Sequence, residues 1–219
     1  MCYHNSIIKD AKALEARYNA TFGLPNRFTP LYHANGRNFP KTPVITSANP
    51  SAINLYNWGL IPSHMNSREA AMERRTATLN ARAETIFQKE SYAIPIMTKR
   101  CLIVSTGFYD WQDFKKKKYP YYIKLKTAEI FSFGGIHDEW VDQDTGEIFE
   151  TYSIVTTEAN PLMARIHNLK KRMPLIFDRE MEKEWLNPTL DKKQIMELMA
   201  IFPDKDMVAY TISKLITSR

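Results

Sequence analysis

The segment EIFSFGGIHDEWVDQDTGEIFETYSIVTT (residues 129–157) lies at the centre of the chain and indicates its fold. Two runs rich in aromatic and β-branched residues, 129–140 and 147–157, flank the short polar segment DQDTG. Two such runs around a turn that contains Gly predict an antiparallel β-hairpin. The middle of the protein is therefore expected to be antiparallel sheet.

Further strands are expected on both sides of this hairpin. CLIVSTGFYDWQ (101–112) and YYIKL (121–125) flank a lysine-rich turn, which predicts a second hairpin. The other expected strands are TPVITS (42–47), LYNWGLIP (55–62), MPLIF (173–177) and DMVAYTISKLI (206–216).

Helices are expected where a capping residue precedes a helical pattern. These are Asp10–Tyr18, Ser67 before REAAMERR, Asn160-Pro161 before LMARIHN, Asp178 before REMEKEWL, and the amphipathic KKQIMELMAIF. Sheet segments with helices at intervals, and no βαβ rhythm, predict an α+β fold. We expect a single domain over residues 1–219, with a mainly antiparallel, barrel-like sheet flanked by helices.

Composition excludes several classes of protein. The chain has 219 residues, 44% hydrophobic and 25% charged, and no apolar run long enough to span a bilayer. Charged residues interrupt the N-terminal segment, so we expect no signal peptide. The protein is therefore expected to be cytoplasmic. Two cysteines without a spacing motif argue against a zinc site or a disulfide framework, and no cofactor is expected. The net charge of +6 favours a nucleic-acid partner only slightly over none.

Cys2 is the first candidate for chemistry, because it follows the initiator Met1 directly. If Met1 is removed, Cys2 carries a thiol and a free α-amine two carbons apart. Both groups titrate near pH 8 and are partly nucleophilic at neutral pH. Such a 1,2-aminothiol can condense with an aldehyde and close a five-membered ring. The alternative, a small buried residue at the start of a strand, is equally compatible with position alone.

The segment TLNARAETI (78–86) places three polar residues at alternating positions. Asn80, Arg82 and Glu84 share one face of an extended chain, with small alanines between them. A solvated edge explains this pattern, but an amide beside a guanidinium also suits a phosphate and an amine.

In STGFYDWQ (105–112), Asp110 lies between two aromatic residues. Apolar surroundings raise the pKa of a carboxyl group, which suits a proton carrier. The alternative is a strand in which Asp110 faces water.

The segment RIHNLKKRMPLIF (165–177) places His167 beside three cations, Lys170, Lys171 and Arg172. An anion would satisfy the whole cluster, although a single histidine is more often structural than catalytic. The basic and aromatic run FKKKKYPYYIK (114–124) is interpreted as a solvated hairpin tip, with a nucleic-acid groove as the alternative.

Together these segments resemble the SRAP family, the SOS response-associated peptidases or abasic-site processing proteins. The resemblance covers nearly the whole chain. It consists of MC at the start, WGLIP (58–62), NARAET (80–85), GFYDW (107–111), IH (166–167), RMPLI (172–176) and ISKLI (212–216).

The resemblance implies a protein of the DNA-damage (SOS) response that binds single-stranded DNA containing an abasic site. The amine of Cys2 forms a Schiff base with the sugar aldehyde, and the thiol closes a thiazolidine, so the protein becomes covalently linked to DNA. It also implies a lyase-type activity and action at the nucleoid.

The resemblance also implies roles for individual residues. Asn80 orients the Cys2 end, Asp110 carries protons in place of the family's glutamate, and His167 assists as acid or base. The implied DNA contacts are His4, Trp58, Arg82, Trp111, Lys170, Lys171 and Arg172. Tyr3-His4 stands where the family often has Gly-Arg, and Asp110 is one methylene shorter than glutamate.

Two other functions remain open at this point. A self-processing cysteine peptidase would use Cys2 as its nucleophile and His167 as its base. A nucleic-acid-binding domain without catalysis would use the basic face alone.

Overall fold

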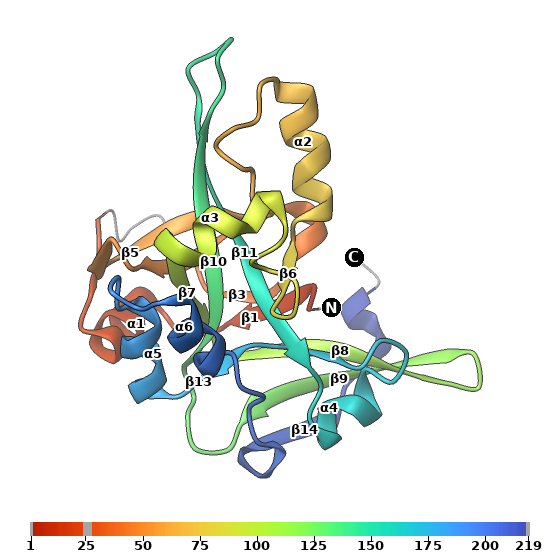
Figure 1. Ribbon diagram of the computed structural model, residues 1–219. Coiled ribbons are helices and arrows are strands. Elements are labelled where there is room, and N and C mark those ends of the chain that lie inside the picture. Colours follow the sequence, from red (N-terminus) through yellow and green to blue (C-terminus); the bar gives the residue numbers. More distant parts are fainter. Residues whose placement is uncertain (1, 24–27, 218–219) are drawn as a thin grey trace.

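The computed structural model describes residues 2–23 and 28–217 of the chain (Figure 1). Within these residues, one sheet has the strand order β14-β9-β8-β1-β3 and a larger one has the order β12-β11-β10-β7-β4-β5-β2. In the larger sheet β13 also pairs with β10, and β6 with β11. The strands are β1 His4–Ile7, β2 Thr21–Phe22, β3 Leu31–Asn35, β4 Lys41–Thr46, β5 Asn49–Trp58, β6 Asn80–Arg82, β7 Arg100–Ser105, β8 Gly107–Phe114, β9 Lys117–Leu125, β10 Phe131–Val141, β11 Ile148–Glu158, β12 Arg172–Pro174, β13 Ile176–Phe177 and β14 Met207–Thr211.

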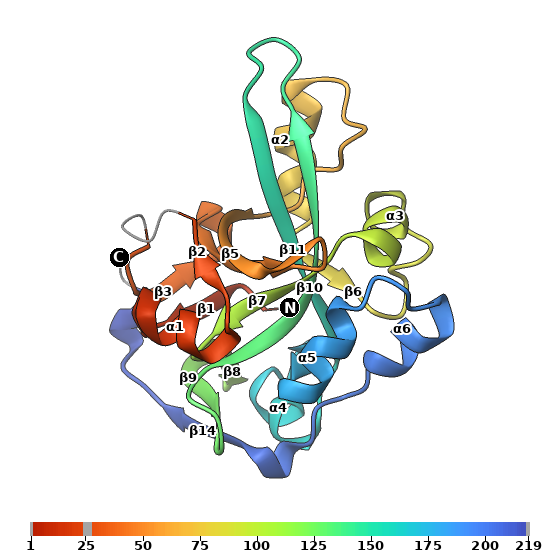
Figure 2. The same cartoon turned by 90° about the vertical axis from the view of Figure 1, so that its left-hand side faces the viewer.

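The predicted fold class is confirmed. Most strand pairs are antiparallel, and parallel pairing occurs where β11 meets β5 and β6 and where β2 meets β5. Helices flank the sheets on their outer sides (Figures 1 and 2). They are α1 Ala11–Tyr18, α2 Arg68–Ala77, α3 Glu90–Thr98, α4 Pro161–Ile166, α5 Arg179–Leu186 and α6 Lys192–Leu198. We interpret residues 1–219 as one domain, since β7 of one sheet leads directly into β8 of the other.

The predicted central hairpin is formed by β10 and β11, with Gly135 opposite Ile154 and Val141 opposite Ile148. Its far end rises out of the body beside α2 (Figure 1). Trp140 on this arm is buried against Ile61 and against Ala71 of α2. The arm and the helix therefore bury a small apolar cluster of their own.

The local capping signals hold. Asp10, Ser67, Asn160 and Asp178 each accept a backbone N–H at the start of the helix that they were expected to cap. Helix α3 was not expected, because Pro95 lies inside it and proline usually interrupts a helix.

Several expected boundaries are wrong. The strand expected over 55–62 is the end of β5, which begins at Asn49 and ends at Trp58, and the one expected over 173–177 is divided between β12 and β13. The segment 101–112 is two strands in different sheets, since β7 ends at Ser105 and β8 begins at Gly107. Helix α6 ends at Leu198, and β14 ends at Thr211 before a 3₁₀ turn over Lys214–Thr217. Both sides of the Ser105–Gly107 junction are buried, so hydrophobicity alone gives no sign of the break.

The short strand β1 lies in the middle of its sheet, between β3 and β8. Asn5 pairs with Ala34 on one side and with Phe108 on the other. Its side-chain amide donates a 2.9 Å hydrogen bond to the carbonyl of Val104 in the other sheet. A chain terminus is usually poorly ordered unless it is tied into such a structure. Here the strand that follows Cys2 is held from both sides.

Candidate active site at the N-terminal strand

Cys2 lies directly before β1 and is almost fully buried, with 2% of its surface exposed. The next residue is also fixed, because the carbonyl of Tyr3 accepts a 2.8 Å hydrogen bond from the N–H of Gly36. Burial, together with the nearby charge of Asp110, raises the pKa of the Cys2 thiol to about 12, although a backbone hydrogen bond from His4 opposes this change. At neutral pH the thiol therefore keeps its proton until a base accepts it. Met1 lies outside the described residues, so its removal stays an expectation.

Asp110 on β8 is the carboxyl group whose charge acts on the Cys2 thiol, and 8% of its surface is exposed. One of its oxygens accepts a 2.8 Å hydrogen bond from the N–H of Trp111. Burial raises the pKa of Asp110 to about 7, although this hydrogen bond opposes the change. A carboxyl group with such a pKa can both accept and donate a proton near neutral pH.

His167 follows α4 and reaches the same place from another part of the chain. Its Nδ1 lies 3.6 Å from Oδ2 of Asp110 and 2.9 Å from the carbonyl of Arg172. Two hydrogen bonds fix the loop to β8: the N–H of Asp113 donates to Asn168 Oδ1 over 3.0 Å, and Asn168 Nδ2 donates to the carbonyl of Asp113 over 2.7 Å. Burial lowers the pKa of His167, so its neutral form is favoured.

Asp110 and His167 face a cleft with a volume of about 520 Å³, which begins at Tyr3, while Cys2 lies buried behind its lining. Its cations are Arg37, Lys118, Lys170 and Lys214, and its carboxylates are Asp110 and Asp113. The lining residues are Tyr3, His4, Arg37, Tyr109, Asp110, Trp111, Asp113, Lys118, Pro120, His167, Leu169, Lys170 and Lys214. Positive charge around two carboxylates and several rings suits a nucleic-acid strand.

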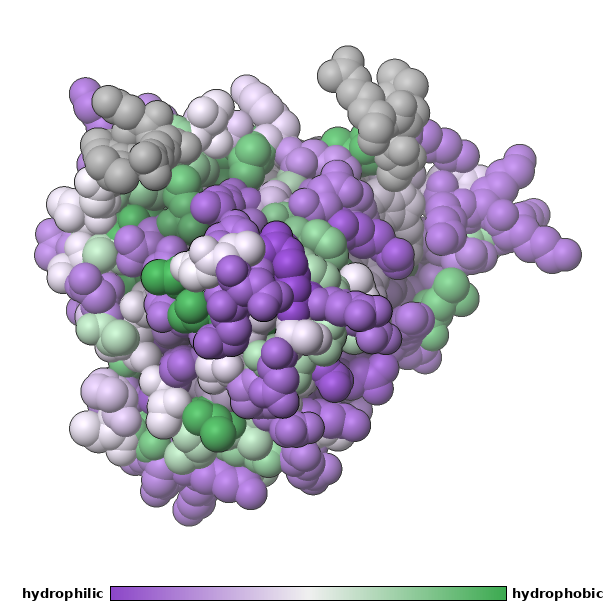
Figure 3. All heavy atoms as spheres, turned by 90° about the horizontal axis from the view of Figure 1, so that it is seen from above, coloured by the Kyte–Doolittle hydropathy of each residue, from purple (hydrophilic) through white to green (hydrophobic). Residues whose placement is uncertain are grey.

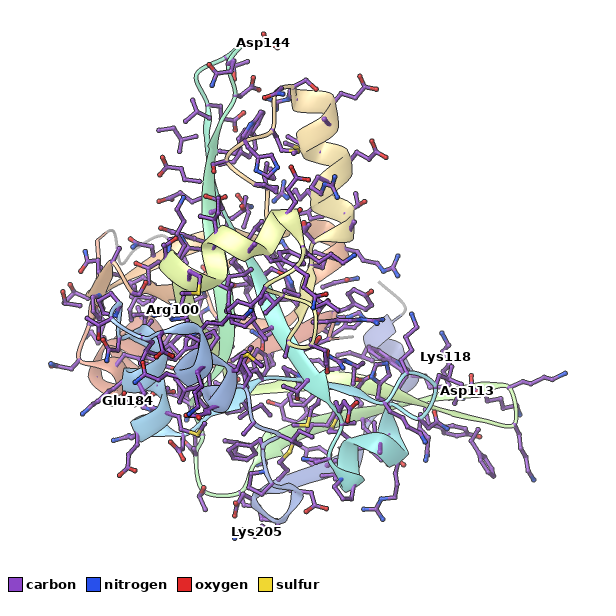
Figure 4. The ribbon with its side chains drawn as sticks, in the orientation of Figure 1. Arg100, Asp113, Lys118, Asp144, Glu184 and Lys205 are labelled. Carbon is purple, nitrogen blue, oxygen red and sulfur yellow. The ribbon has the colours of Figure 1, made fainter. Side chains whose placement is uncertain are left out.

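The β8–β9 hairpin extends this positive surface away from the body. Asp113 and Lys118 face each other across it where it leaves the body (Figure 4). Beyond them, the exposed lysines 115–117 form the tip, which appears as a hydrophilic projection in the view from above (Figure 3).

Comparison of the sequence with known protein families shows which family this chain belongs to. The family model of the SOS response associated peptidases (SRAP) matches residues 1–219. The chain belongs to the SRAP family.

Two curated relatives in the SRAP family come from Bacillus subtilis (strain 168). The abasic site processing protein YoqW is 35% identical over 223 residues, which cover 100% of this chain and 95% of the relative. The abasic site processing protein YobE is 34% identical, with 100% and 97% covered. A crystal structure of a protein from Bacteroides thetaiotaomicron has a TM-score of 0.96 at 44% identity, covering 100% of this chain and 95% of that one.

Five of the residues that the SRAP resemblance singled out line the cleft together: His4, Trp111, Lys170, Asp110 and His167. The ring of His4 packs edge-on against that of Trp111, with centroids 4.5 Å apart. Burial and the neighbouring His33 lower the pKa of His4 to about 4. His4 therefore faces the cleft as a neutral ring and does not replace the charge of the family's arginine.

Asn80 and Arg82 lie on β6, which runs parallel to β11. Asn80 is 7% exposed, and among the described residues neither its amide nitrogen nor its amide oxygen has a hydrogen-bond partner. A buried polar group without a partner is costly, typically by about 1–3 kcal/mol. A ligand or a chain end that reached Asn80 would complete these hydrogen bonds. Arg82 is exposed, and its charge acts on Tyr3 at the mouth of the cleft.

The structure places three other expected DNA contacts elsewhere. Trp58 has no exposed surface, and its ring N–H donates a 2.8 Å hydrogen bond to the carbonyl of Leu79. The assignment of Trp58 to DNA is therefore corrected, since no part of its ring is accessible. Arg172 is also buried: both terminal nitrogens bind Glu84, at 2.6 and 3.0 Å, and one donates to the carbonyl of Thr156 at 2.6 Å. A phosphate could reach Arg172 only by displacing these partners. Lys171 is exposed, but it does not line the cleft.

Sequence reasoning missed Arg37, Lys118 and Lys214 as cleft residues. Arg37 lies over the ring of Tyr3 at 5.2 Å and lies in the segment YHANGRNFP. Lys118 ends the lysine-rich turn, and Lys214 belongs to ISKLI. Lys118 and Lys214 were inside segments already noted, and Arg37 was not, but only the structure shows which cations face the cleft.

Among the described residues, no group of His, Cys, Asp and Glu side chains could hold a metal ion. None of the described helices has the length and hydropathy that a bilayer crossing requires.

Proposed function

We propose that this protein processes abasic sites by forming a covalent crosslink to them through Cys2, after removal of Met1. The α-amine of Cys2 attacks the sugar aldehyde and water leaves, which gives an imine. The thiol sulfur then adds to the imine carbon, the thiol proton leaves to a base, and the nitrogen gains a proton. The product is a thiazolidine that joins the protein to the DNA.

The observation that carries this proposal is the placement of Cys2 beside Asp110. A thiol whose pKa is about 12 cannot close the ring unless a base lies next to it. Asp110, with a pKa of about 7, can accept that proton and can protonate the hydroxyl that leaves as water. Nδ1 of His167 lies 3.6 Å from Oδ2 of Asp110, so His167 can take over the proton that Asp110 accepts. Asn80, with its unpaired amide, is proposed to orient the freed N-terminus.

We propose single-stranded DNA as the substrate, in the DNA-damage (SOS) response. The cleft offers an exposed set of cations for phosphates and the half-buried ring of Trp111 for stacking. Base pairs would have to be unstacked before a duplex could enter, at a cost of roughly a few kcal/mol. Arg82, Lys170, Lys171 and, once released from Glu84, Arg172 are the proposed phosphate contacts. A lyase-type strand cleavage through the same imine is proposed as a side reaction.

A cysteine peptidase is the second candidate, and the pKa of Cys2 counts against it. A nucleophilic cysteine works as a thiolate and has a lowered pKa beside a cationic histidine. Here burial raises the pKa of Cys2 and lowers that of His167, so a thiolate–imidazolium pair is disfavoured. We therefore rank a peptidase role, including self-processing, second to the crosslink.

One denaturing gel tests the proposal. The mature protein is mixed with single-stranded DNA that contains one abasic site, and with the same strand intact. A band that survives denaturation with the abasic strand alone is expected, and it should be absent for Cys2→Ala. No stable band with either strand would refute the crosslink. Binding that is lost on denaturation would indicate a binding domain without catalysis.

A further inference from the structure

A second cleft, of about 370 Å³, lies behind one wall of the candidate active site and is lined by four tyrosines, three isoleucines and two serines. Its tyrosines are Tyr32, Tyr109, Tyr122 and Tyr210, from four different strands of the smaller sheet. Tyr109 lines both clefts. The two hollows are therefore neighbours that share a single aromatic wall. The chemistry proposed above uses none of the other three tyrosines.

An unbroken series of ring contacts joins the two clefts. It begins at Trp111, which follows Asp110 in β8, and ends at Tyr210, which lines the second cleft. The ring centroids are separated by 4.5 Å for Trp111–His4, 4.9 Å for His4–His33, 5.2 Å for His33–Tyr109, 5.0 Å for Tyr109–Tyr122 and 5.7 Å for Tyr122–Tyr210.

Hydrogen bonds and close packing fix the inner rings of this series. The hydroxyl of Tyr109 donates to the carbonyl of Tyr32 over 2.7 Å, and that of Tyr122 donates to the carbonyl of Thr106 over 3.1 Å. Gly107 lets the second ring lie against β8, because a Cβ there would be 2.2 Å from the hydroxyl oxygen of Tyr122. The wall is thus already ordered, so a ligand that stacks on it loses little free energy to its rearrangement.

The outer rings are open to solvent, since Tyr32 is 74% and Tyr210 is 47% exposed. Among the described residues that line this cleft, none is charged. It therefore suits a flat, uncharged ring rather than a phosphate. A cation lies between the two clefts, because Lys214 lines the first cleft and directly follows Ser213, which lines the second. This alternation of cation and ring is the pattern that holds single-stranded nucleic acid, with bases on aromatic side chains and phosphates on cations.

We infer that the tyrosine cleft binds an unpaired nucleobase of the same strand whose abasic site occupies the first cleft. This inference rests on the proposed function, because the abasic site fixes the register of the strand. The strand passes the shared wall at Tyr109, its phosphates lie near Lys214, and a base on one side of the lesion stacks on Tyr210 and Tyr32. The protein then binds a lesion with bases on that side more tightly than one without them.

The test uses oligonucleotides that contain a tetrahydrofuran abasic analogue, which has no aldehyde and so binds reversibly. A short strand is compared with strands extended by a few nucleotides on the 5′ or on the 3′ side only. Base–aromatic stacking is worth roughly 1–3 kcal/mol per base, so one of the two extensions should tighten the Kd about tenfold. Tyr210→Ala should abolish this gain, and Tyr210→Phe should keep it because the ring remains. Ile148→Ala, an exposed apolar residue on the distant hairpin arm, should also keep it.

Several outcomes would overturn the inference. These are a gain from neither extension, a full gain in Tyr210→Ala, or an equal gain when the added nucleotides lack bases. The last would assign the affinity to phosphates. A parallel reaction with a true abasic site in the short strand separates this inference from the proposed function. Tyr210→Ala should crosslink that strand at the parent rate, whereas a parent protein that forms no crosslink would refute the proposed function itself.

Discussion

Replacing Asp110 by Asn should make the protein more stable at alkaline pH while removing most of its activity. Burial raises the pKa of Asp110 from the usual 3.8 to about 7. Between these two values the folded protein binds a proton that the unfolded chain has released. Stability therefore falls as the pH rises through this window, and the loss is complete above pH 7. At about 1.4 kcal/mol per pH unit, the window of roughly three units amounts to about 4 kcal/mol at pH 8.

An Asn side chain cannot ionise, so the Asp110→Asn variant does not lose stability as the pH rises. Its side-chain oxygen can still accept the hydrogen bond that Asp110 receives from the N–H of Trp111. Urea unfolding at pH 8 should give Asp110→Asn a free energy of unfolding higher than the parent's by up to about 4 kcal/mol. At pH 4.5 the difference should shrink to about 1 kcal/mol, because the pH is then only slightly above the unfolded pKa of 3.8. Crosslinking to abasic single strands should meanwhile slow by a factor on the order of 10² or more, with affinity nearly unchanged, because a proton carrier is lost.

Asp144→Asn is the control for stability, since Asp144 lies at the exposed tip of the hairpin arm (Figure 4). It should change the free energy of unfolding at neither pH. Equal stability of Asp110→Asn and the parent at both pH values would show that the buried carboxylate carries no penalty. An unchanged crosslinking rate would show that the proton travels by His167 or water instead.

Three further predictions concern the thiol, a phosphate contact and the packing of the aromatic wall. Cys2→Ala should abolish the stable crosslink, whereas Cys101→Ala should keep it, because Cys101 lies in the core with no exposed surface; a denaturing gel compares them. Arg82→Ala should weaken binding to abasic and intact single strands alike, and should flatten the plot of log affinity against log salt by about 0.7; an unchanged slope would remove Arg82 from the phosphate contacts. Gly107→Ala should lower the free energy of unfolding by about 1–3 kcal/mol, since its Cβ would lie 2.2 Å from a tyrosine hydroxyl, while Gly23→Ala has nothing within 4 Å and should cost far less in the same urea titration.

The parts of the fold that the sequence predicted are those fixed by short-range interactions. A capping side chain and the N–H that it binds are two or three residues apart, as in Asp10 with Ala13 and Asn160 with Met163. The central hairpin is local in the same way, because its two strands are joined by one short turn. Such interactions appear in any short window of sequence, so they could be recognised without the rest of the chain.

The parts that could not be predicted depend on pairings between distant segments. Arg82 and Arg172 look alike in the sequence, as basic residues beside small or apolar ones. Glu84 was expected to share a face with Arg82, but it binds Arg172, 88 positions further along the chain. That pairing leaves one arginine exposed and buries the other. The split of segment 101–112 has the same origin, since β7 and β8 find their partners in different sheets.

The proposed chemistry requires a nucleophile that is both at the chain terminus and held in a fixed position. Cys2 meets the first condition by its place in the sequence, and β1 meets the second by its place in the sheet. The proposed ring closure needs an amine and a thiol on one residue, so the nucleophile must be at the chain terminus. A terminus frays unless other elements hold it, and proton transfer needs groups within hydrogen-bond reach. An edge strand would be paired on one side only. β1 lies between β3 and β8, so Cys2, directly before β1, is held where the charge of Asp110 on β8 acts on its thiol. β8 in turn holds the loop of His167 through Asn168. The burial that fixes this end also raises the pKa values of both Cys2 and Asp110, so the thiol stays protonated until the carboxylate beside it acts.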